Sequence, residues 1–276
     1  DRIRLLGYYS RQPGHHTKGL VVLLHGWEGS SESTYVRTTG RYLYRLGFDV
    51  FRLNFRDHGP SHHLNTGIFY AVLLDEVFDA VRQICAAAHP GPTFLAGFSL
   101  GGNFALRIAR RCVTQPIAGL RRVVSISPVL DPDKATDRID GSPLILKYFL
   151  KKWRRSLSIK QRLYPERYDF SGLLNIDNIR EMTERLLARY SSYDCAASYF
   201  RHYSLLGSDV VDISVPTTII TAEDDPIIPV ADFHELQTSP ATQLIIQRYG
   251  GHNGFLENWR LRGWYERLMG DLFSIP

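Results

Sequence analysis

A Gly-Phe-Ser-Leu-Gly run at residues 97–101 carries the strongest signal for chemistry in this chain. It follows the apolar residues 92–96 and precedes residues 103–108, whose pattern is typical of a helix. A serine between small residues at a strand-to-helix turn is a nucleophile elbow, because large neighbours would not fit so tight a turn. The turn exposes the hydroxyl to the positive end of the following helix. We therefore predict that Ser99 is a nucleophile; the alternative is a glycine-rich turn without chemistry.

A serine hydroxyl needs a base to take its proton and a carboxylate to hold that base. Two loops downstream supply such groups, and each follows an apolar, strand-like run. Residues 217–221 lead into the acidic residues 223–225, and residues 244–247 lead into a glycine-flanked loop with His252. The ends of parallel strands are where an open α/β sheet collects its ligands. We predict His252 as the base and one carboxyl of residues 223–225 as its partner; the alternatives are a structural loop histidine and solvated turn carboxylates.

Attack by a serine on a carbonyl also requires N–H groups that stabilise the developing negative oxygen. The backbone N–H of Leu100, directly after the serine, is one expected donor. Trp27, in the His-Gly-Trp-Glu-Gly loop after an early strand-like run, is the other. We expect His25 of the same loop to hold the loop rather than to act as a second base.

The elements that must position these groups follow from an alternation of two patterns. Short apolar runs, typical of buried strands, occupy residues 20–24, 50–53, 93–96, 123–126, 217–221 and 244–247. Segments of helical length lie between or after them at about 33–46, 68–88, 100–112, 231–236 and 258–273. This alternation predicts an α/β fold with a mostly parallel central sheet and helices on both faces.

The alternation stops between residues 128 and 212, which are aromatic, basic and helix-like, with helices expected at about 144–155, 177–190 and 193–203. So long an excursion is unusual for a plain connection in a compact domain. It predicts an inserted helical cap at 128–212 on a core made of residues 1–127 and 213–276.

With these residues in hand, the chain resembles the α/β-hydrolase superfamily over essentially its whole length. The narrower resemblance is to the YheT-like, embryogenesis-associated hydrolase branch. It rests on residues 25–31 (His-Gly-Trp-Glu-Gly-Ser-Ser) with Tyr35, on 54–56, 97–102, 224–229 and 251–255. The turn at residues 57–59 departs from the pattern expected of that branch, so no function is carried over to it.

The resemblance implies acyl-ester chemistry without a metal or an organic cofactor, on a small-molecule ester substrate. It favours Asp225 as the triad acid, because the loop after it resembles the acid loop of many α/β-hydrolases; Asp224 is the alternative. Substrate contacts are expected from Trp27, Phe98 and Phe255.

The leading hypothesis is a serine esterase that cleaves short-to-medium acyl esters through Ser99, His252 and Asp225. An acyltransferase or a phospholipase would use the same triad and stays open as an alternative. A dehalogenase or epoxide hydrolase on this fold normally has Asp at the position of Ser99. A catalytically silent binding protein usually lacks a triad member, so both are disfavoured.

The composition is that of an ordinary globular chain, with 276 residues, 44% hydrophobic residues and a net charge of +5. This weak positive balance does not specify a nucleic-acid binder. No apolar run approaches the ~20 residues that span a bilayer, and no signal peptide is visible. Three scattered cysteines indicate a reduced setting, so a cytoplasmic protein is expected.

Two local features could suggest a functional site, but we expect neither to be one. Asp57 with His58, His62 and His63 could suggest a metal site, but we expect a solvated loop there and no metal. Cys85 and Cys112 lie in helical patterns and are expected to be small buried residues.

Residues 147–162 combine aromatic residues with basic ones and contain no acid. We expect a helix that buries Phe149, Leu150 and Trp153 while its cations stay in water. A weak contact with a membrane surface through this basic cap is the alternative.

Overall fold

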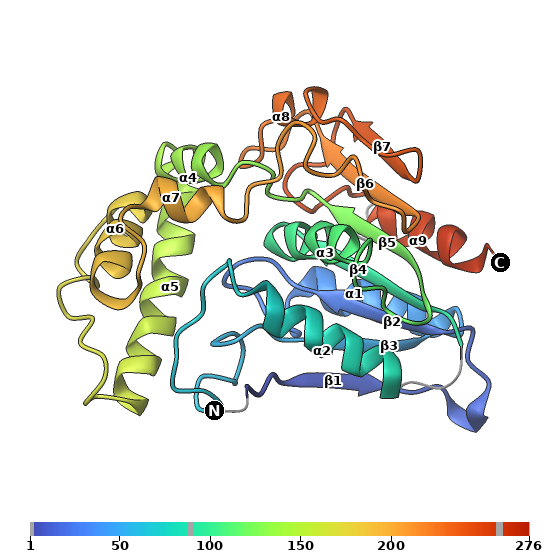
Figure 1. The fold of residues 1–276 in the computed structure, drawn as a ribbon, viewed down its shortest axis with the longest axis horizontal. Helices are drawn as coiled ribbons and strands as arrows, with labels where there is room; N and C mark the ends of the chain where they lie inside the picture. The colour runs from blue at the N-terminus through green and yellow to red at the C-terminus, as the bar shows by residue number, and fades with distance from the viewer. Residues whose placement is uncertain (1–2, 88–90, 258–261, 276) are drawn as a thin grey trace.

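The computed structural model describes residues 3–87, 91–257 and 262–275, with a seven-stranded sheet at the centre (Figure 1). The strands lie in the order β1-β3-β2-β4-β5-β6-β7. Strands β2 to β7 are parallel, and β1 pairs antiparallel with β3 at one edge. The bounds are β1 (Gly7–Ser10), β2 (Leu20–Leu24), β3 (Asp49–Leu53), β4 (Thr93–Phe98), β5 (Leu120–Ile126), β6 (Thr217–Ala222) and β7 (Thr242–Gln247). The predicted mostly parallel α/β sheet is confirmed.

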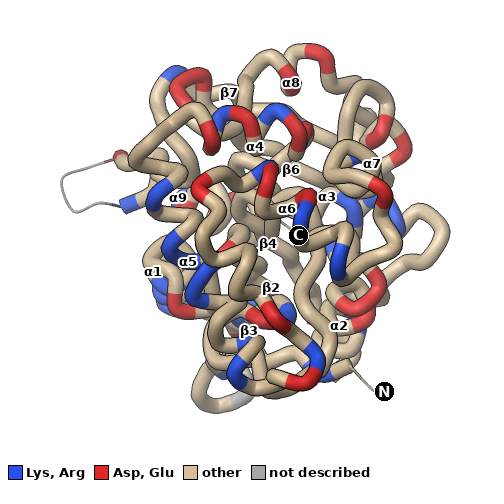
Figure 2. The backbone as a smooth tube through the Cα atoms, turned by 90° about the vertical axis from the view of Figure 1, so that its left-hand side faces the viewer, with Lys and Arg blue, Asp and Glu red and all other residues tan. Residues whose placement is uncertain are grey.

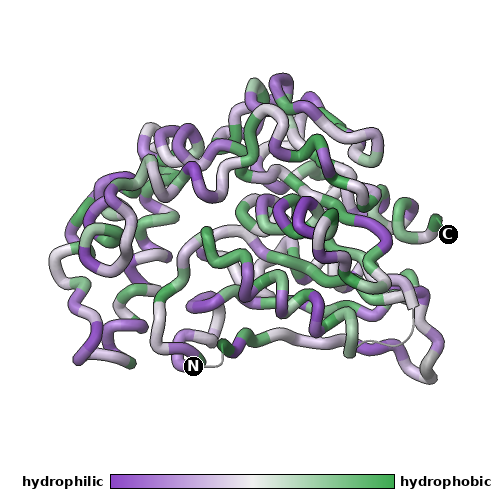
Figure 3. The backbone as a smooth tube through the Cα atoms, in the orientation of Figure 1, coloured by the Kyte–Doolittle hydropathy of each residue, from purple (hydrophilic) through white to green (hydrophobic). Residues whose placement is uncertain are grey.

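Strand β1 was not predicted, because it lacks the apolar run that marks a buried strand. It is four residues long, and its two tyrosines, Tyr8 and Tyr9, are exposed. By contrast, all five residues of β2 are buried, as a central parallel strand covered on both faces requires. Figure 3 shows the apolar residues gathered along the central strands.

Helices cover both faces of the sheet. On one face, α1 (Thr34–Arg45) and α9 (Trp264–Ser274) pack in one apolar cluster. On the other, α2 (Leu74–Ala87), α3 (Leu100–Arg111) and the residues around the short α8 (Ala231–His234) belong to a second cluster. A 3-10 helix, η1 (Pro13–His15), lies between β1 and β2. The helix expected at 258–273 begins at Trp264 in the structure, and residues 258–261 of that expectation lie outside the described residues.

The helix expected from residue 68 starts only at Leu74, which corrects the sequence interpretation. Tertiary hydrogen bonds hold the preceding segment instead. The Phe69 N–H donates to Asp57 (3.0 Å), and the Ala71 N–H donates to the Tyr199 hydroxyl (2.8 Å). Acidic residues in the first turn, Asp75 and Glu76, favour the later start.

Four helices lie between β5 and β6: α4 (Pro132–Asp140), α5 (Pro143–Leu163), α6 (Ile179–Tyr190) and α7 (Ala196–Arg201). They gather on the left of Figure 1, and residues 127–216, all described, add no strand to the sheet. The polar α4 was missed; Asp131 caps it by accepting from the Asp133 and Lys134 N–H groups. The division into core and inserted cap at residues 128–212 stays a prediction.

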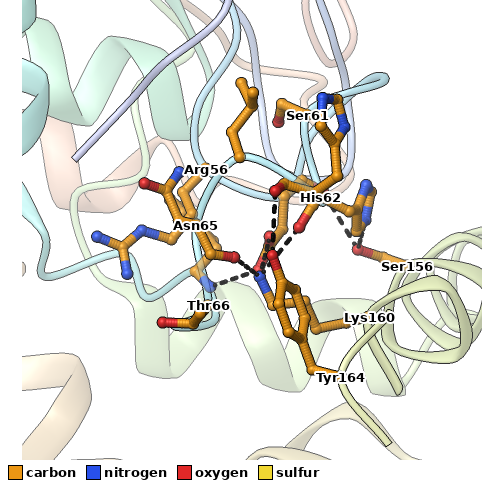
Figure 4. A network of polar contacts seen from close by, with 12 residues as sticks. Arg56, Ser61, His62, Asn65, Thr66, Ser156, Lys160 and Tyr164 are labelled. Carbon is orange, nitrogen blue, oxygen red and sulfur yellow. Dashed lines mark hydrogen bonds and ion pairs between the residues drawn. The ribbon is translucent and has the colours of Figure 1, made fainter. Parts of the chain in front are cut away.

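A buried ion pair joins α5 to the segment after β3 (Figure 4). The Lys160 ammonium donates to Asp57 at 2.8 Å, to the Asn65 carbonyl at 2.7 Å and to the His62 carbonyl at 3.3 Å. The side chains of Lys160 and Asp57 are only 1% and 7% exposed. Burial lowers the pKa of Lys160 and raises that of Asp57, and the attraction between the two charges opposes both shifts.

The expectation of a solvated loop around Asp57, His58 and His62 is therefore wrong, since all three residues are buried. The Ser156 hydroxyl of α5 lies 2.8 Å from His62 Nε2, a second contact between α5 and this segment. The residues of this turn are polar because they form buried hydrogen bonds and an ion pair with α5, which lies about a hundred residues further along the chain.

We expect Lys160→Ala to lower the free energy of unfolding by about 3–5 kcal/mol, because it leaves the Asp57 carboxylate buried without its partner. Urea unfolding followed by circular dichroism measures the change. The control is Arg162→Ala on the same helix, where an exposed side chain is removed and a change within about 0.5 kcal/mol is expected. Equal effects of the two substitutions would contradict the structural role of the pair.

Candidate active site

Ser99 occupies a strained turn between β4 and α3. Its backbone has φ 54° and ψ −116°, a conformation that side-chain-bearing residues rarely adopt. Glycines make the turn possible, because a Cβ on Gly97 would lie 2.0 Å from the Gly101 carbonyl oxygen. A Cβ on Gly101 would lie 2.5 Å from the carbonyl oxygens of Leu24 and His25. The elbow thus packs backbone against backbone on the loop after β2.

The structure brings Ser99, His252 and Asp225 into one hydrogen-bond chain, although they come from the ends of three different strands. The Ser99 Oγ lies 3.0 Å from His252 Nε2. On the other side of the ring, His252 Nδ1 lies 2.9 Å from Asp225 Oδ2 and 3.2 Å from Oδ1. If Nδ1 carries the proton and donates it to the carboxylate, Nε2 is free to accept the serine proton.

The two neighbouring aspartates have separate contacts. Asp225 Oδ1 accepts from the N–H groups of Ile227 and Ile228 at 2.8 and 2.9 Å, and its side chain is fully buried. Asp224 Oδ1 accepts from the Gly250 and Gly251 N–H groups, both at 2.8 Å. Asp225 therefore meets the imidazole, while Asp224 holds the loop that carries it.

The predicted oxyanion donors lie on the two loops that meet at the elbow. Trp27 and Leu100 both line the main cavity beside Ser99. Within the described part of the chain, neither backbone N–H has an acceptor at hydrogen-bond distance.

Two buried histidines fix the loop after β2. His25 Nε2 accepts from the Phe55 N–H at 3.1 Å, and its Nδ1 lies 2.7 Å from the Gly26 carbonyl. His58 accepts the Glu28 N–H at 3.1 Å. Burial lowers the pKa of His25 to about 4 and that of His58 well below its ordinary value, so both rings are neutral and can accept these bonds.

The main cavity extends from Ser99 and His252 to the helices α4–α7. The space along this cavity, open solvent at its mouth included, is about 1080 Å³. Its walls are chiefly aliphatic and aromatic, with Ile139, Trp153 and Leu186 from the helices among them. Trp27 stacks on Phe149 of α5 and meets Trp153 edge-on, both at 5.2 Å between ring centroids.

A second cleft, which is more open to solvent and which we call the outer cleft, shares Ser99 and His252 with the main cavity. Ser99 and His252 line it together with Leu144, Tyr148 and Phe149 from the start of α5. Ser99 therefore lines both the main cavity and the outer cleft, and α5 contributes to both.

Phe98 and Phe255, expected to contact substrate, lie elsewhere, which corrects that expectation. Both are almost fully buried in the cluster of α1 and α9, on the opposite face of the sheet from the main cavity. Both rings lie edge-on to Tyr265, and neither residue lines the cavity or the cleft. Of the three expected contact residues, Trp27 alone lines these spaces.

Glu28 is a cavity residue that the sequence interpretation missed. Its backbone is held from two sides, by His58 and by the Lys152 ammonium, which donates to the Glu28 carbonyl at 2.9 Å. Burial raises the pKa of its carboxyl to about 8; Asp57 adds to the shift and Lys152 opposes it. In the sequence, only its position next to Trp27 in this loop could have indicated that Glu28 lines the cavity.

The described residues also bear on other kinds of site. No group of three or more His, Cys, Asp or Glu side chains gathers there in a way that could hold a metal ion. No described helix is long and apolar enough to span a bilayer. The cysteines are free thiols, and Cys85 and Cys112 are buried as expected.

The parallel sheet, its helical layers and its likeness to solved structures show that the chain has the α/β-hydrolase fold. A match to a family of hydrolases shows that it is an enzyme. Residues 15–257 match the family described as "Serine aminopeptidase, S33", and the chain belongs to this family.

Individual relatives are distant. The chain is 24% identical to mouse (Mus musculus) phospholipase ABHD3 over 87% of its own length and 59% of that protein. It is 21% identical to the monoacylglycerol lipase of Saccharomyces cerevisiae over 99% of its length and 63% of that protein, so it spans about six-tenths of both relatives. The esterase Pf2001 of Pyrococcus furiosus shares the fold at a TM-score of 0.59 and 20% identity, with 98% of this chain and 85% of that one covered. These relatives support an esterase- or lipase-type hydrolase.

The raised pKa of Glu28 predicts a pH dependence of stability. The folded chain keeps a proton on Glu28 up to about pH 8, whereas the unfolded chain releases it near 4.5. Stability from this group is therefore lost as the pH rises through that window. We expect the melting temperature of Glu28→Gln, relative to the unsubstituted chain, to rise between pH 5 and pH 9, by about 2–4 °C for each 1 kcal/mol.

Differential scanning fluorimetry across that pH range measures the difference. Glu235→Gln, at an exposed position, serves as control and should show no such trend. A difference for Glu28→Gln that stays constant with pH would contradict the assigned shift.

Proposed function

We propose that this chain is a serine esterase that hydrolyses carboxylic esters with short-to-medium acyl chains. The observation that carries the proposal is the hydrogen-bond chain from Ser99 through His252 to Asp225, which opens on an apolar cavity. Few arrangements other than nucleophilic acyl transfer require a serine, a histidine and a buried carboxylate in this order.

In the proposed reaction, Ser99 Oγ attacks the ester carbonyl while His252 Nε2 takes its proton. Asp225 holds the imidazole and stabilises its positive charge. The N–H groups of Trp27 and Leu100 bind the tetrahedral oxyanion. His252 then gives its proton to the leaving alcohol, and water releases the acyl group from Ser99 with the same groups in reversed roles. No cofactor takes part.

The two spaces beside Ser99 support a division of the substrate between them. Both spaces have chiefly apolar walls, and we assign the acyl chain to the main cavity because it is the more enclosed of the two. Each buried CH₂ contributes about 0.8 kcal/mol, roughly fourfold in binding. The alcohol part belongs in the outer cleft, which is open to solvent. Phosphate and amine groups of larger lipids would have to fit there.

An acyltransferase would keep the same residues and admit an alcohol in place of water. A phospholipase is favoured by the likeness to mouse ABHD3 and differs only in the alcohol part of the ester. A catalytically silent binding protein is disfavoured, because the serine, histidine and carboxylate are all within hydrogen-bond distance. Membership of the YheT-like branch and a cytoplasmic location belong to the same proposal.

The test is hydrolysis of aryl esters by the purified chain and its variants. Ser99→Ala should abolish turnover, and Asp225→Asn should lower kcat on the order of 10⁴-fold, because the amide no longer fixes the productive imidazole tautomer. Turnover by Ser99→Ala within tenfold of the unsubstituted chain would refute the proposal.

The neighbouring carboxylate provides the matched control. Asp224→Asn keeps an oxygen that can accept from the Gly250 and Gly251 N–H groups, so a much smaller loss is expected. A larger loss for Asp224→Asn than for Asp225→Asn would place the triad acid one residue earlier.

The acyl-chain assignment predicts a length profile. The kcat/KM should rise from acetate over the first few carbons until the main cavity is full. Trp153→Ala enlarges that cavity and should move the optimum to longer chains without changing the pH profile, since His252 is untouched. Trp264→Ala, outside the cavity, is the control and should keep the original optimum. A flat profile from acetate to octanoate, unaltered by Trp153→Ala, would exclude the cavity as the acyl pocket.

A further inference from the structure

We propose that the outward side of α5 docks the protein on an anionic lipid surface, with the outer cleft facing that surface. The docking surface consists of Leu144, Lys147, Tyr148, Lys151 and Arg155, and we call it the α5 stripe. It is distinct from the catalytic residues, and its binding does not depend on the proposed reaction.

The spacing of these residues places them on one side of the helix. Positions 144, 148, 151 and 155 follow each other at intervals of three or four, which forms a continuous stripe along an α-helix. Leu144 is 84% exposed and Tyr148 is 55% exposed, although each has a large apolar side chain. Lys147, Lys151 and Arg155 are exposed beside them.

The opposite side of α5 fixes how the stripe is presented. Trp153 and Leu157 are buried against the main apolar cluster, and Lys160 is buried in its ion pair with Asp57. A rotation of α5 that buried Leu144 or Tyr148 would break these contacts. The helix therefore holds the apolar end of the stripe toward solvent.

The charge of α5 is positive along its whole length, because residues 143–163 include no acid. Figure 2 shows basic residues along this helix. Three other cations of α5 have partners: Arg154 pairs with Asp177, Lys152 donates to the Glu28 carbonyl, and Lys160 pairs with Asp57. Across the part of the chain that the structure describes, no carboxylate forms an ion pair with Lys147, Lys151 or Arg155. Their charge is therefore available to an external anionic surface.

The apolar end of the stripe lies at the entrance to the site. Leu144 and Tyr148 line the outer cleft with Ser99 and His252. A lipid surface in contact with these two side chains would face the mouth of that cleft. Binding there would shorten the path of an ester from the lipid layer to Ser99.

The mixture of side chains favours a lipid surface over an acidic protein. At the interface between acyl chains and anionic headgroups, a leucine and a tyrosine can contact the acyl chains while neighbouring lysines contact the headgroups. Each basic residue near such a surface contributes separately to the binding free energy, without the shape complementarity that a protein partner requires.

Co-sedimentation with vesicles tests the proposal, and Ser99→Ala protein is used so that no lipid can be cleaved through this serine. Because binding alone is measured, failure of the proposed esterase activity would leave the result unaffected. We expect binding to vesicles of phosphatidylcholine with equimolar phosphatidylserine, much weaker binding to phosphatidylcholine alone, and loss of binding as salt increases. Absence of binding to the anionic vesicles would overturn the proposal.

The matched pair of variants locates the surface. Lys147→Gln with Lys151→Gln should weaken binding by more than tenfold, from roughly fivefold for each basic residue. Arg41→Gln with Arg45→Gln removes two exposed cations one turn apart on α1 and should have little effect. Equal losses for the two pairs would show attraction by net charge alone and would refute the α5 stripe.

The apolar part is tested separately. Leu144→Ser with Tyr148→Ser should weaken binding to the anionic vesicles while the charge is unchanged, and circular dichroism checks that α5 stays folded. In an otherwise unsubstituted chain, the lysine pair should leave hydrolysis of a short water-soluble ester unchanged. Binding that is insensitive to the serine pair would contradict insertion of these side chains.

Discussion

The close backbone packing around Ser99 is the constraint on which the rest of the site depends. Gly97 and Gly101 allow β4, α3 and the loop after β2 to approach so closely that a Cβ at either position would collide with a carbonyl oxygen. This contact sets the distance between the Trp27 loop and the start of α3. It also holds Ser99 at a φ of 54°, with its hydroxyl within 3.0 Å of His252. Relaxing the turn would separate all of these groups together.

Around this centre, polar side chains hold the loops through hydrogen bonds to backbone N–H groups. Neutral His25 and His58 accept backbone N–H groups from two loops, and the adjacent Asp224 and Asp225 accept four more. The bonds to His25, His58 and Asp225 satisfy donors that would otherwise lie in the interior without a partner, at a cost of about 1–3 kcal/mol. The bonds to Asp224 are exposed. The loops at the ends of the strands are therefore held by specific bonds rather than by general hydrophobicity.

The helix α5 connects three properties of the protein. Its inner side closes the main cavity with Phe149 and Trp153, and its far end is tied to the core by Lys160 and Asp57. Its outer side carries exposed Leu144 and Tyr148 beside exposed cations. One helix therefore bears the cavity wall, the buried ion pair and the exposed stripe.

The local elements and the order of the chemical groups could be predicted from the pattern of residues along the chain. Continuous apolar runs are sufficient for buried parallel strands, and glycines around Ser99 permit only a tight turn, so β2 to β7 and the elbow could be predicted. Parallel strands also end at one edge, which anticipated that Ser99, Asp225 and His252 would lie near each other. The surroundings of Phe98 and Lys160 could not be predicted, because they depend on contacts between residues far apart in the sequence. Phe98 adjoins Ser99 in sequence yet lies on the opposite face of the sheet, because successive side chains of a strand alternate sides. Lys160 resembles its basic neighbours in sequence, and only the position of Asp57, 103 residues earlier, makes it a buried partner.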